Sequence, residues 1–210
     1  MRTRVKICGI TRVEDGVSAA AAGADAIGLV FYPGSPRFVE VDRAAAVAAA
    51  LPPFVTKVAL FVDAAHEEIE QIVARVPIDL IQFHGNESPD FCSRQGKPYI
   101  KAIRMQPGVD LHAQRERYHH ACGLLVDSYK AGVPGGTGEI FNWSLIPDDL
   151  AAEITLAGGL NPDNVAAAID AVHPWGVDVS GGVEAAKGIK DAAAIERLIR
   201  GVELGDRNTD

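Results

Sequence analysis

The 210-residue sequence is short of positive charge, of long apolar runs and of cysteine, and each shortage excludes a class of protein. Its formal net charge of −8 argues against general binding to nucleic acid, although an anionic small ligand can still bind in a locally positive pocket. Charges or pairs of Pro and Gly interrupt each apolar stretch before it reaches the length of a membrane span, and residues 1–5 have no apolar signal-peptide core. We therefore expect no nucleic-acid partner and no membrane partner.

Cysteine usage argues against a disulfide framework and against a metal centre. The three cysteines, Cys8, Cys92 and Cys122, are odd in number and share no metal-ligand spacing. A reducing compartment fits this usage best, so we expect a cytoplasmic protein without a bound metal. We interpret Cys92 and Cys122 as packing residues. Taken alone, Cys8 is equally well explained as a small buried apolar residue, and only its neighbours in the sequence favour another role.

Apolar segments of strand length alternate with helical segments over almost the whole chain. The expected strands are Val5–Cys8, Ala26–Tyr32, Lys57–Val62, Leu80–His84, Tyr99–Met105, Gly123–Ser128, Glu153–Gly158 and Gly176–Ser180. Such alternation predicts a parallel sheet with right-handed crossovers. The eight units fit a single α/β domain, a (β/α)8 TIM barrel with short loops, over residues 1–204, followed by a polar tail at residues 205–210. An open doubly wound sheet is the alternative, but the first turn lacks the Gly-x-Gly-x-x-Gly spacing of a dinucleotide site.

Several segments between the strands are typical of helices. The expected helices include Arg12–Ala22, Asp42–Leu51, Ala65–Arg75 and Asp110–His120. Asp42 is a suitable N-cap for the second of them, and Asn161 followed by Pro162 predicts a capped helix start later in the chain. No segment indicates a domain boundary.

Polar side chains stand at the carboxyl ends of several expected strands, although a buried parallel strand is normally apolar throughout. The residues concerned are Cys8, Gln82, His84, Asp127, Asp178 and Ser180. Because the active sites of (β/α)8 barrels lie at the carboxyl ends of the strands, we expect these side chains to converge there.

Cys8 and Asp127 are interpreted as a proton-transfer pair carried on separate strands. Strand alternation puts Lys6 and Cys8 on the same face. A cation beside a thiol favours the thiolate, which is the form that can act as a nucleophile or a base. We therefore expect Lys6 to lower the pKa of the Cys8 thiol.

Two glycine pairs follow the last two expected strands and predict a phosphate site. They are Gly158-Gly159 and, directly after Ser180, Gly181-Gly182. Glycine allows backbone amides to approach an anion closely, and the loops after strands seven and eight bind phosphate in many barrels of this type. Tight turns are the alternative explanation for either pair.

Two further features suggest contacts with a ligand. Arg37, held between Pro36 and Phe38, has the geometry to grip a carboxylate bidentately, and an ordinary surface charge is the alternative. A third glycine cluster at residues 132–138 is long enough to be a loop that closes over a substrate.

Seven short segments, which are spread in order over nearly the whole chain, match the pattern of one protein family. They are Lys6–Thr11, Ser35–Arg37, Gln82–Gly85, Leu125–Ser128, Gly135–Gly138 with Phe141 and Trp143, Ala157–Pro162 and Val177–Glu184. With these segments the sequence resembles phosphoribosylanthranilate isomerase, whose fold is a (β/α)8 barrel. It departs from the family pattern at Asn142, where an aspartate is expected, and at Gly181, where a second serine is usual.

The resemblance implies an Amadori rearrangement of N-(5-phosphoribosyl)anthranilate to 1-(2-carboxyphenylamino)-1-deoxyribulose 5-phosphate, the third committed step of tryptophan biosynthesis, without a metal or a redox cofactor. Cys8 is then the expected base and Asp127 the expected acid. The implied substrate-binding residues are Lys6, Arg37, Gln82, His84, Gly136, Thr137, Gly138 and Asp178, and the implied phosphate-binding residues are Gly158, Gly159, Ser180, Gly181 and Gly182. Individual roles for Gln82 and His84 stay unassigned.

Two alternatives are open at this point. A sister phosphate-binding barrel, such as indole-glycerol-phosphate synthase, shares the loops after strands seven and eight, but it is expected to carry a lysine-rich acid–base set and an added amino-terminal helix. A sugar-phosphate-binding protein without catalysis would not need Cys8 and Asp127 together. The expected oligomeric state is a monomer or a homodimer.

Overall fold

The structure, a computed structural model, describes residues 2–128 and 141–208. Eight parallel strands pair in sequence order, and the eighth pairs with the first to close a barrel. The barrel strands are β1 (Arg4–Cys8), β2 (Ala26–Val30), β3 (Thr56–Phe61), β4 (Leu80–Phe83), β5 (Tyr99–Met105), β6 (Gly123–Ser128), β7 (Ile154–Leu156) and β8 (Gly176–Val179). The expected (β/α)8 barrel is therefore confirmed, and the open doubly wound sheet is excluded.

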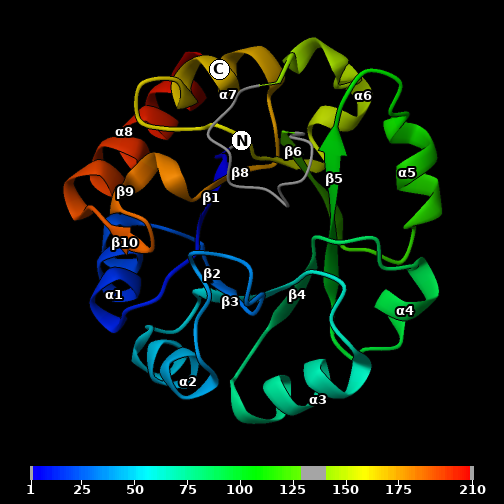
Figure 1. The fold of residues 1–210 in the computed structure, drawn as a ribbon. Coiled ribbons are helices and arrows are strands. Elements are labelled where there is room, and N and C mark those ends of the chain that lie inside the picture. The colour runs from blue at the N-terminus through cyan, green and yellow to red at the C-terminus, as the bar shows by residue number, and fades with distance from the viewer. Residues whose placement is uncertain (1, 129–140, 209–210) are drawn as a thin grey trace.

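Helices surround the barrel on its outside (Figure 1). They are α1 (Val13–Ala22), α2 (Val41–Ala50), α3 (His66–Arg75), α4 (Pro89–Ser93), α5 (Leu111–Arg117), α6 (Asp148–Ala151), α7 (Val165–Val172) and α8 (Ala192–Asn208), with the 3₁₀ turns η1 (Trp143–Leu145) and η2 (Gly181–Val183). A small antiparallel hairpin of β9 (Glu184–Ala186) and β10 (Ile189–Lys190) follows η2 and was not expected from the sequence. Within the described ranges, no helix is both long enough and apolar enough to cross a membrane.

The barrel strands are buried on both faces, because helices cover the outside and side chains fill the inside. Ile7 and Ile27 are fully buried and belong to the large core between the strands and the helices. Cys8, Val30 and Leu60 form a separate small cluster. Neighbouring side chains of one strand therefore lie in different environments. The alternation that places Ile7 in the outer core turns Cys8 toward the barrel interior.

Most element boundaries differ from the expected ones by one or two residues, because packing decides where each element ends. α2 begins at Val41, so Asp42 lies inside the first turn and the expected capping by Asp42 is wrong. α7 itself begins only at Val165, but Asn161 caps the turn that leads into it: its Oδ1 accepts a hydrogen bond from the backbone N–H of Asp163 at 2.8 Å, and its carbonyl oxygen accepts one from the N–H of Val165 at 3.1 Å. The expected cap is therefore present, and only the start of the regular helix differs.

The end of the chain is helical where a polar tail was expected. α8 continues to Asn208, and Gly205 is buried within it. The carboxylate of Asp206 accepts hydrogen bonds from the backbone N–H of Thr3 at 3.0 Å and from its hydroxyl at 2.6 Å. Residues 205–208 are therefore held against the start of the chain, and the boundary expected after residue 204 falls inside a helix.

Two cysteines interpreted as packing residues differ in their surroundings. Cys92 is fully buried, as expected. Cys122 is exposed, so its interpretation as a packing residue is wrong. It stands directly before β6, where the chain arrives from an exposed turn.

Candidate active site

A cavity of about 420 Å³ opens at the carboxyl ends of the barrel strands. Its wall brings together most of the residues singled out in the sequence: Cys8, Arg37, Gln82, His84, Asp127, Gly158, Gly159, Asp178, Ser180, Gly181 and Gly182. Lys6 is buried and is paired with Asp178. Three expected substrate-binding residues, Gly136, Thr137 and Gly138, lie outside the described residues together with the rest of the 132–138 glycine cluster.

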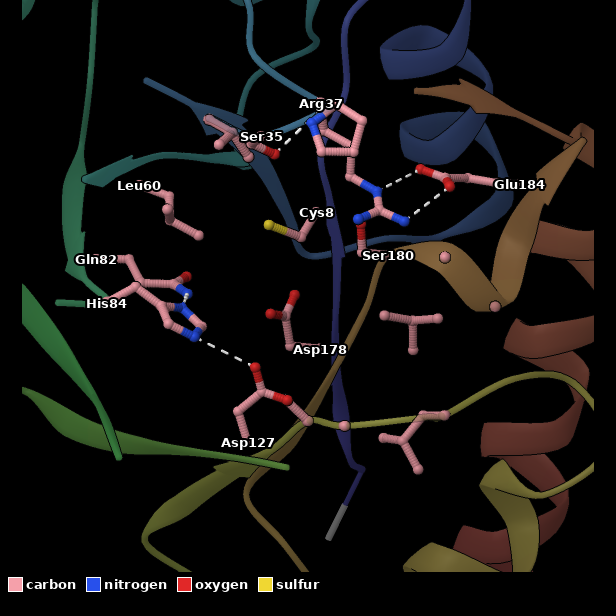
Figure 2. A pocket seen from close by; sticks show the side chains of 18 of the residues that line it. Cys8, Ser35, Arg37, Leu60, Gln82, His84, Asp127, Asp178, Ser180 and Glu184 are labelled. Carbon is pink, nitrogen blue, oxygen red and sulfur yellow. Dashed lines mark hydrogen bonds and ion pairs between the residues drawn. The ribbon is translucent and has the colours of Figure 1, made fainter. Parts of the chain in front are cut away.

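The thiol of Cys8 points into this cavity from the end of β1 (Figure 2). Gly28 of β2 lies directly beside it in the sheet register. A Cβ atom at Gly28 would come within 2.7 Å of the Cys8 sulfur, which is closer than van der Waals contact allows. The missing side chain at Gly28 therefore makes the space that the thiol occupies.

Lys6 lies close to the thiol, but it does not make the thiol acidic overall. Its Nζ is 2.8 Å from Oδ1 of Asp178 in a buried ion pair. Burial raises the pKa of Cys8 above its ordinary value of 9.0, the Lys6 cation lowers it, and the Asp178 carboxylate raises it again. The direction expected for the influence of Lys6 is correct, but the expected net lowering is wrong, because burial and Asp178 outweigh the cation.

Asp127, at the end of β6, is buried and held from two sides. Its Oδ1 accepts a hydrogen bond from the backbone N–H of Ser128 at 2.8 Å, and its Oδ2 lies 3.2 Å from Nε2 of His84. Nδ1 of His84 is 3.0 Å from the side-chain nitrogen of Gln82 (Figure 2). If that amide nitrogen donates, Nδ1 is the acceptor and the proton of the neutral ring is on Nε2, facing Asp127. Gln82 of β4 and His84, which directly follows that strand, thus form a short polar chain that ends at the carboxyl group.

Arg37 is not a solvated surface charge. Its Nε and Nη2 are 2.7 and 2.9 Å from the two carboxylate oxygens of Glu184, and its side chain is only 12% exposed. Its hydrogen bonds to Glu184 raise the pKa of the guanidinium, although burial opposes this. Gly9 is necessary for this placement, because a Cβ there would lie 2.6 Å from Cδ of Arg37. The protein's own carboxylate therefore occupies one edge of the guanidinium, and the edge formed by Nη1 and Nη2 is left for a ligand.

The two glycine pairs are packed against other backbone as well as lining the cavity. A Cβ at Gly182 would lie 2.0 Å from the carbonyl oxygen of Leu160, and a Cβ at Gly158 would lie 2.7 Å from the backbone nitrogen of Ser128. Loop packing alone thus requires glycine at these two positions. Their place in the cavity wall is the separate observation that favours an anion site.

Three charged residues close to the pocket were not predicted from the sequence. Glu184 stands only at the end of a segment that matches the family pattern, and Lys187 and Lys190 belong to no such segment. Lys187 lines the cavity and is exposed, whereas Lys190 is almost fully buried. Both lysines stand on or beside the β9–β10 hairpin, whose residues show no strand or helix periodicity long enough to place their side chains.

The cavity wall carries the Cys8 thiol, the carboxyl groups of Asp127, Asp178 and Glu184, and the cationic side chains of Arg37 and Lys187. A thiol and a carboxyl group are suited to proton transfer, and the two cations are suited to binding anionic groups of a ligand. Within residues 2–128 and 141–208, no three or more His, Cys, Asp or Glu side chains are grouped as a metal site requires. The base candidate comes from β1 and the acid candidate from β6, with β7 and β8 between these two strands in the barrel, and both side chains line the cavity (Figure 2).

Comparisons with known proteins agree with this geometry. The family described as N-(5'-phosphoribosyl)anthranilate (PRA) isomerase matches residues 5–200. A curated relative of that name from Alcanivorax borkumensis is 61% identical over 207 residues and covers 95% of each chain. A second, from Pseudomonas aeruginosa, is 57% identical over 205 residues, which are 98% of this chain and 97% of the other.

Solved structures of the same kind superpose over nearly the whole chain. Phosphoribosylanthranilate isomerase from Thermotoga maritima is 37% identical, has a TM-score of 0.87, and is matched over 96% of this chain and 98% of that one. A structure of such an isomerase in complex with reduced 1-(o-carboxyphenylamino)-1-deoxyribulose 5-phosphate has a TM-score of 0.84, at the same identity and coverage.

Proposed function

Since the chain belongs to the N-(5'-phosphoribosyl)anthranilate isomerase family, we propose that Cys8 is the general base and Asp127 the general acid of its reaction. The enzyme converts N-(5-phosphoribosyl)anthranilate to 1-(2-carboxyphenylamino)-1-deoxyribulose 5-phosphate in tryptophan biosynthesis. Membership of this family sets aside the sister-barrel and non-catalytic alternatives. The observation that carries the proposal is that both side chains enter one cavity from separate strands, β1 and β6.

The reaction requires one proton donor and one proton acceptor. The protonated carboxyl group of Asp127 gives its proton to the ring oxygen as the bond between that oxygen and C1 breaks, and the nitrogen lone pair forms the Schiff base. The Cys8 thiolate then removes the proton from C2, and the electrons of that bond form the enolamine. Tautomerisation of the enolamine gives the ketone, so no electrons leave the substrate and no redox partner is needed.

The thiolate forms in the substrate complex rather than in the free protein. Burial raises the pKa of the Cys8 thiol in the structure. The protonated Schiff base is a cation close to the sulfur, and an adjacent cation favours the ionised thiol. Lys6 adds to this effect because its contribution already lowers the pKa of Cys8, and Asp178 holds Lys6 in place through the ion pair.

The remaining contacts hold the two ends of the substrate and orient the acid. Arg37 binds the anthranilate carboxylate through its Nη1–Nη2 edge, while the backbone amides of the two glycine loops and Ser180 bind the phosphate. His84 orients Asp127, and Gln82 orients His84. The resemblance alone supports substrate contacts for Gly136, Thr137 and Gly138.

Binding of a product analogue can distinguish a loss of proton transfer by Cys8 or Asp127 from a loss of the folded binding site. Cys8→Ser and Asp127→Asn should bind the reduced 1-(o-carboxyphenylamino)-1-deoxyribulose 5-phosphate with affinities within a few-fold of the wild type, yet turn over almost no substrate. The analogue already has an opened sugar and needs neither proton transfer. Loss of analogue binding in both variants would contradict the proposal, since it would make the two side chains binding groups.

We also propose a cytoplasmic homodimer. The reducing compartment follows from the cysteine usage. The dimer is supported by a solved structure of monomers generated from the dimeric isomerase of Thermotoga maritima, and by Phe54, a fully exposed aromatic side chain before β3 with a φ of 70°. Sedimentation equilibrium should give twice the chain mass for the wild type and the chain mass for Phe54→Glu, and equal masses would contradict an interface at Phe54.

A further inference from the structure

A buried lysine lies behind the glycine loop that follows β8. The side chain of Lys190, on β10, is 1% exposed. Its Nζ donates to the carbonyl oxygen of Ser180 at 3.0 Å and to Oε1 of Glu184 at 3.0 Å. Its backbone N–H donates to Asp15 at 3.1 Å, which anchors the strand from the other side. The cation is therefore fixed next to the residue from which the loop begins.

The hydrogen bond to Ser180 sets the direction of the next backbone amide. No cis peptide bond occurs in the described chain, and in a trans peptide the C=O and N–H groups point in opposite directions. Because the Ser180 carbonyl is turned toward Lys190, the N–H of Gly181 is turned away from it. Ser180 and Gly181 both line the cavity, so Lys190 fixes the direction of a peptide unit in the cavity wall.

The charges around this loop are not balanced. Glu184 serves two cations, because it also accepts both hydrogen bonds from Arg37. Lys6 and Asp178 compensate each other in their own ion pair. Two cations with a single carboxylate leave one positive charge beside the loop. Glycine amides supply only partial charges, whereas a fixed ammonium in a poorly solvated region acts over a longer distance.

We propose that Lys190 is a positioning residue of the phosphate site, which turns the Gly181 amide into the cavity and supplies the positive charge that the glycine loop lacks. This inference rests on the proposed function, because it assumes that the substrate phosphate binds at the loops after β7 and β8. It adds to that function a side chain that lies outside the cavity and acts through Ser180.

Three variants test the proposal. Lys190→Met removes the charge and the hydrogen bonds, and it leaves Glu184 paired with Arg37. Lys190→Gln removes the charge but keeps an N–H donor, so it separates the effect of the charge from the effect of the hydrogen bond to Ser180. It also replaces the methionine variant in the test if that variant folds poorly. Lys57→Met is the matched control, because Lys57 also pairs with a carboxylate, Asp79 at 2.9 Å, but at the opposite end of the barrel.

The readouts are competitive inhibition by inorganic phosphate, competitive inhibition by anthranilate, and KM and kcat for the substrate. In Lys190→Met we expect the phosphate inhibition constant and KM to rise roughly tenfold, since a nearby charge in a protein interior contributes on that scale. In the same variant, the anthranilate inhibition constant and kcat should stay within about twofold of the wild type. For Lys190→Gln, the phosphate inhibition constant and KM should lie between those of the wild type and those of Lys190→Met. Lys57→Met should match the wild type in all of these readouts. Thermal unfolding confirms that each variant is folded.

Three outcomes would overturn the inference. Unchanged phosphate inhibition in a folded Lys190→Met or Lys190→Gln protein would show that the buried cation has no part in the site. Equal weakening of phosphate and anthranilate inhibition would show a general disturbance of the cavity instead of a phosphate effect. A wild-type enzyme that phosphate does not inhibit competitively would refute the phosphate site itself, which is a failure of the proposed function rather than of Lys190 alone.

Discussion

Two buried Lys–Glu pairs lie behind two loops of this active site, and they differ in charge balance. Lys101 donates to the backbone carbonyl groups of Phe83, the last residue of β4, and of Gly85 in the loop that follows, and to Glu87 at 3.0 Å. Lys190 donates to a backbone carbonyl of the loop after β8 and to Glu184 at 3.0 Å. The arrangement is the same, and in both cases the lysine reaches a loop that follows a barrel strand.

The balance differs because only one of the two glutamates is shared. Glu87 meets a single cation and accepts its other hydrogen bonds from backbone N–H groups, whereas Glu184 also binds Arg37. A balanced pair fixes a loop without adding net charge, and it lies on the side that carries Asp127, the proposed acid. An unbalanced pair adds positive charge, and it lies on the side proposed to bind the carboxylate and the phosphate of the substrate. We refer to these as the acid side and the anion side.

Removing the base on the anion side should have the largest effect. Cys8→Ser should keep the fold and lower kcat by about 10²–10⁴-fold, because a hydroxyl is far harder to ionise than a thiol. The measurement is the loss of anthranilate-type fluorescence with freshly made substrate. Cys92→Ser and Cys122→Ser are the controls and should stay close to the wild type. Near-normal turnover by Cys8→Ser would show that Cys8 is an ordinary packing residue and not the base.

Removing the proton on the acid side should have a slightly smaller effect. Asp127→Asn keeps the shape and the hydrogen bonds but cannot donate to the ring oxygen, so kcat should fall by about 10²-fold or more while KM changes only a few-fold. A substrate analogue with an opened sugar should recover part of the rate. If the closed and opened forms lose activity equally, Asp127 orients the substrate and is not the acid.

The two lysines should differ in their effect on stability. Lys101→Met leaves a buried Glu87 carboxylate with no cation, which should lower the free energy of unfolding by about 3–5 kcal/mol. Lys190→Met should cost less, because Glu184 keeps Arg37. Urea unfolding measures both, and Lys101→Met combined with Glu87→Leu should recover much of the loss. If the two single variants lose the same free energy of unfolding, the proposed difference in charge balance between the acid side and the anion side is wrong.

Alkylation of the Cys8 thiol should depend steeply on pH. Burial raises its pKa above 9.0 in the free protein, so the thiolate is scarce at neutral pH and its fraction grows about tenfold per pH unit until the pKa is reached. In a Cys92→Ser, Cys122→Ser background, the rate with iodoacetamide should still be rising at pH 9, and Lys6→Met should react more slowly at each pH. A plateau well below pH 9 would show that Lys6 outweighs burial.

Arg37→Ala should change binding more than chemistry. If Arg37 holds the carboxylate equally in the ground and transition states, KM should rise roughly tenfold with kcat nearly unchanged. Glu184 then loses one of its two cations, and Lys190 keeps it paired, so urea unfolding should shift little. An unchanged KM in a variant of normal stability would exclude Arg37 from substrate binding.

The strands that carry the site residues could largely be predicted from the sequence, because the pattern that indicates a strand is local. Period-two alternation is a property of a few consecutive residues, and it placed Cys8 and Asp127 at the ends of strands of the right length. Closure of eight parallel strands then brings any such ends to one rim. Strands β5 and β6 have the boundaries expected from their apolar runs alone.

The partners of the site residues could not be predicted in the same way. Arg37 and Glu184 are 147 positions apart, and their contact depends on how two irregular loops pack. The sign of the shift in the pKa of Cys8 depends on burial in three dimensions, which a neighbouring lysine in the sequence does not reveal. The cap expected at Asp42 failed for a related reason, since the entry of the chain into α2 is set by contacts outside the helix.

The contact between Gly182 and the carbonyl of Leu160 bears on the entropy of binding. A Cβ at Gly182 would lie 2.0 Å from that oxygen, so the loops after β7 and β8 already touch backbone to backbone before any ligand arrives. Loops that are packed together in advance have little conformational freedom left to lose. Capture of a phosphate there should therefore be limited by stripping water from the anion, with little further cost for ordering the protein.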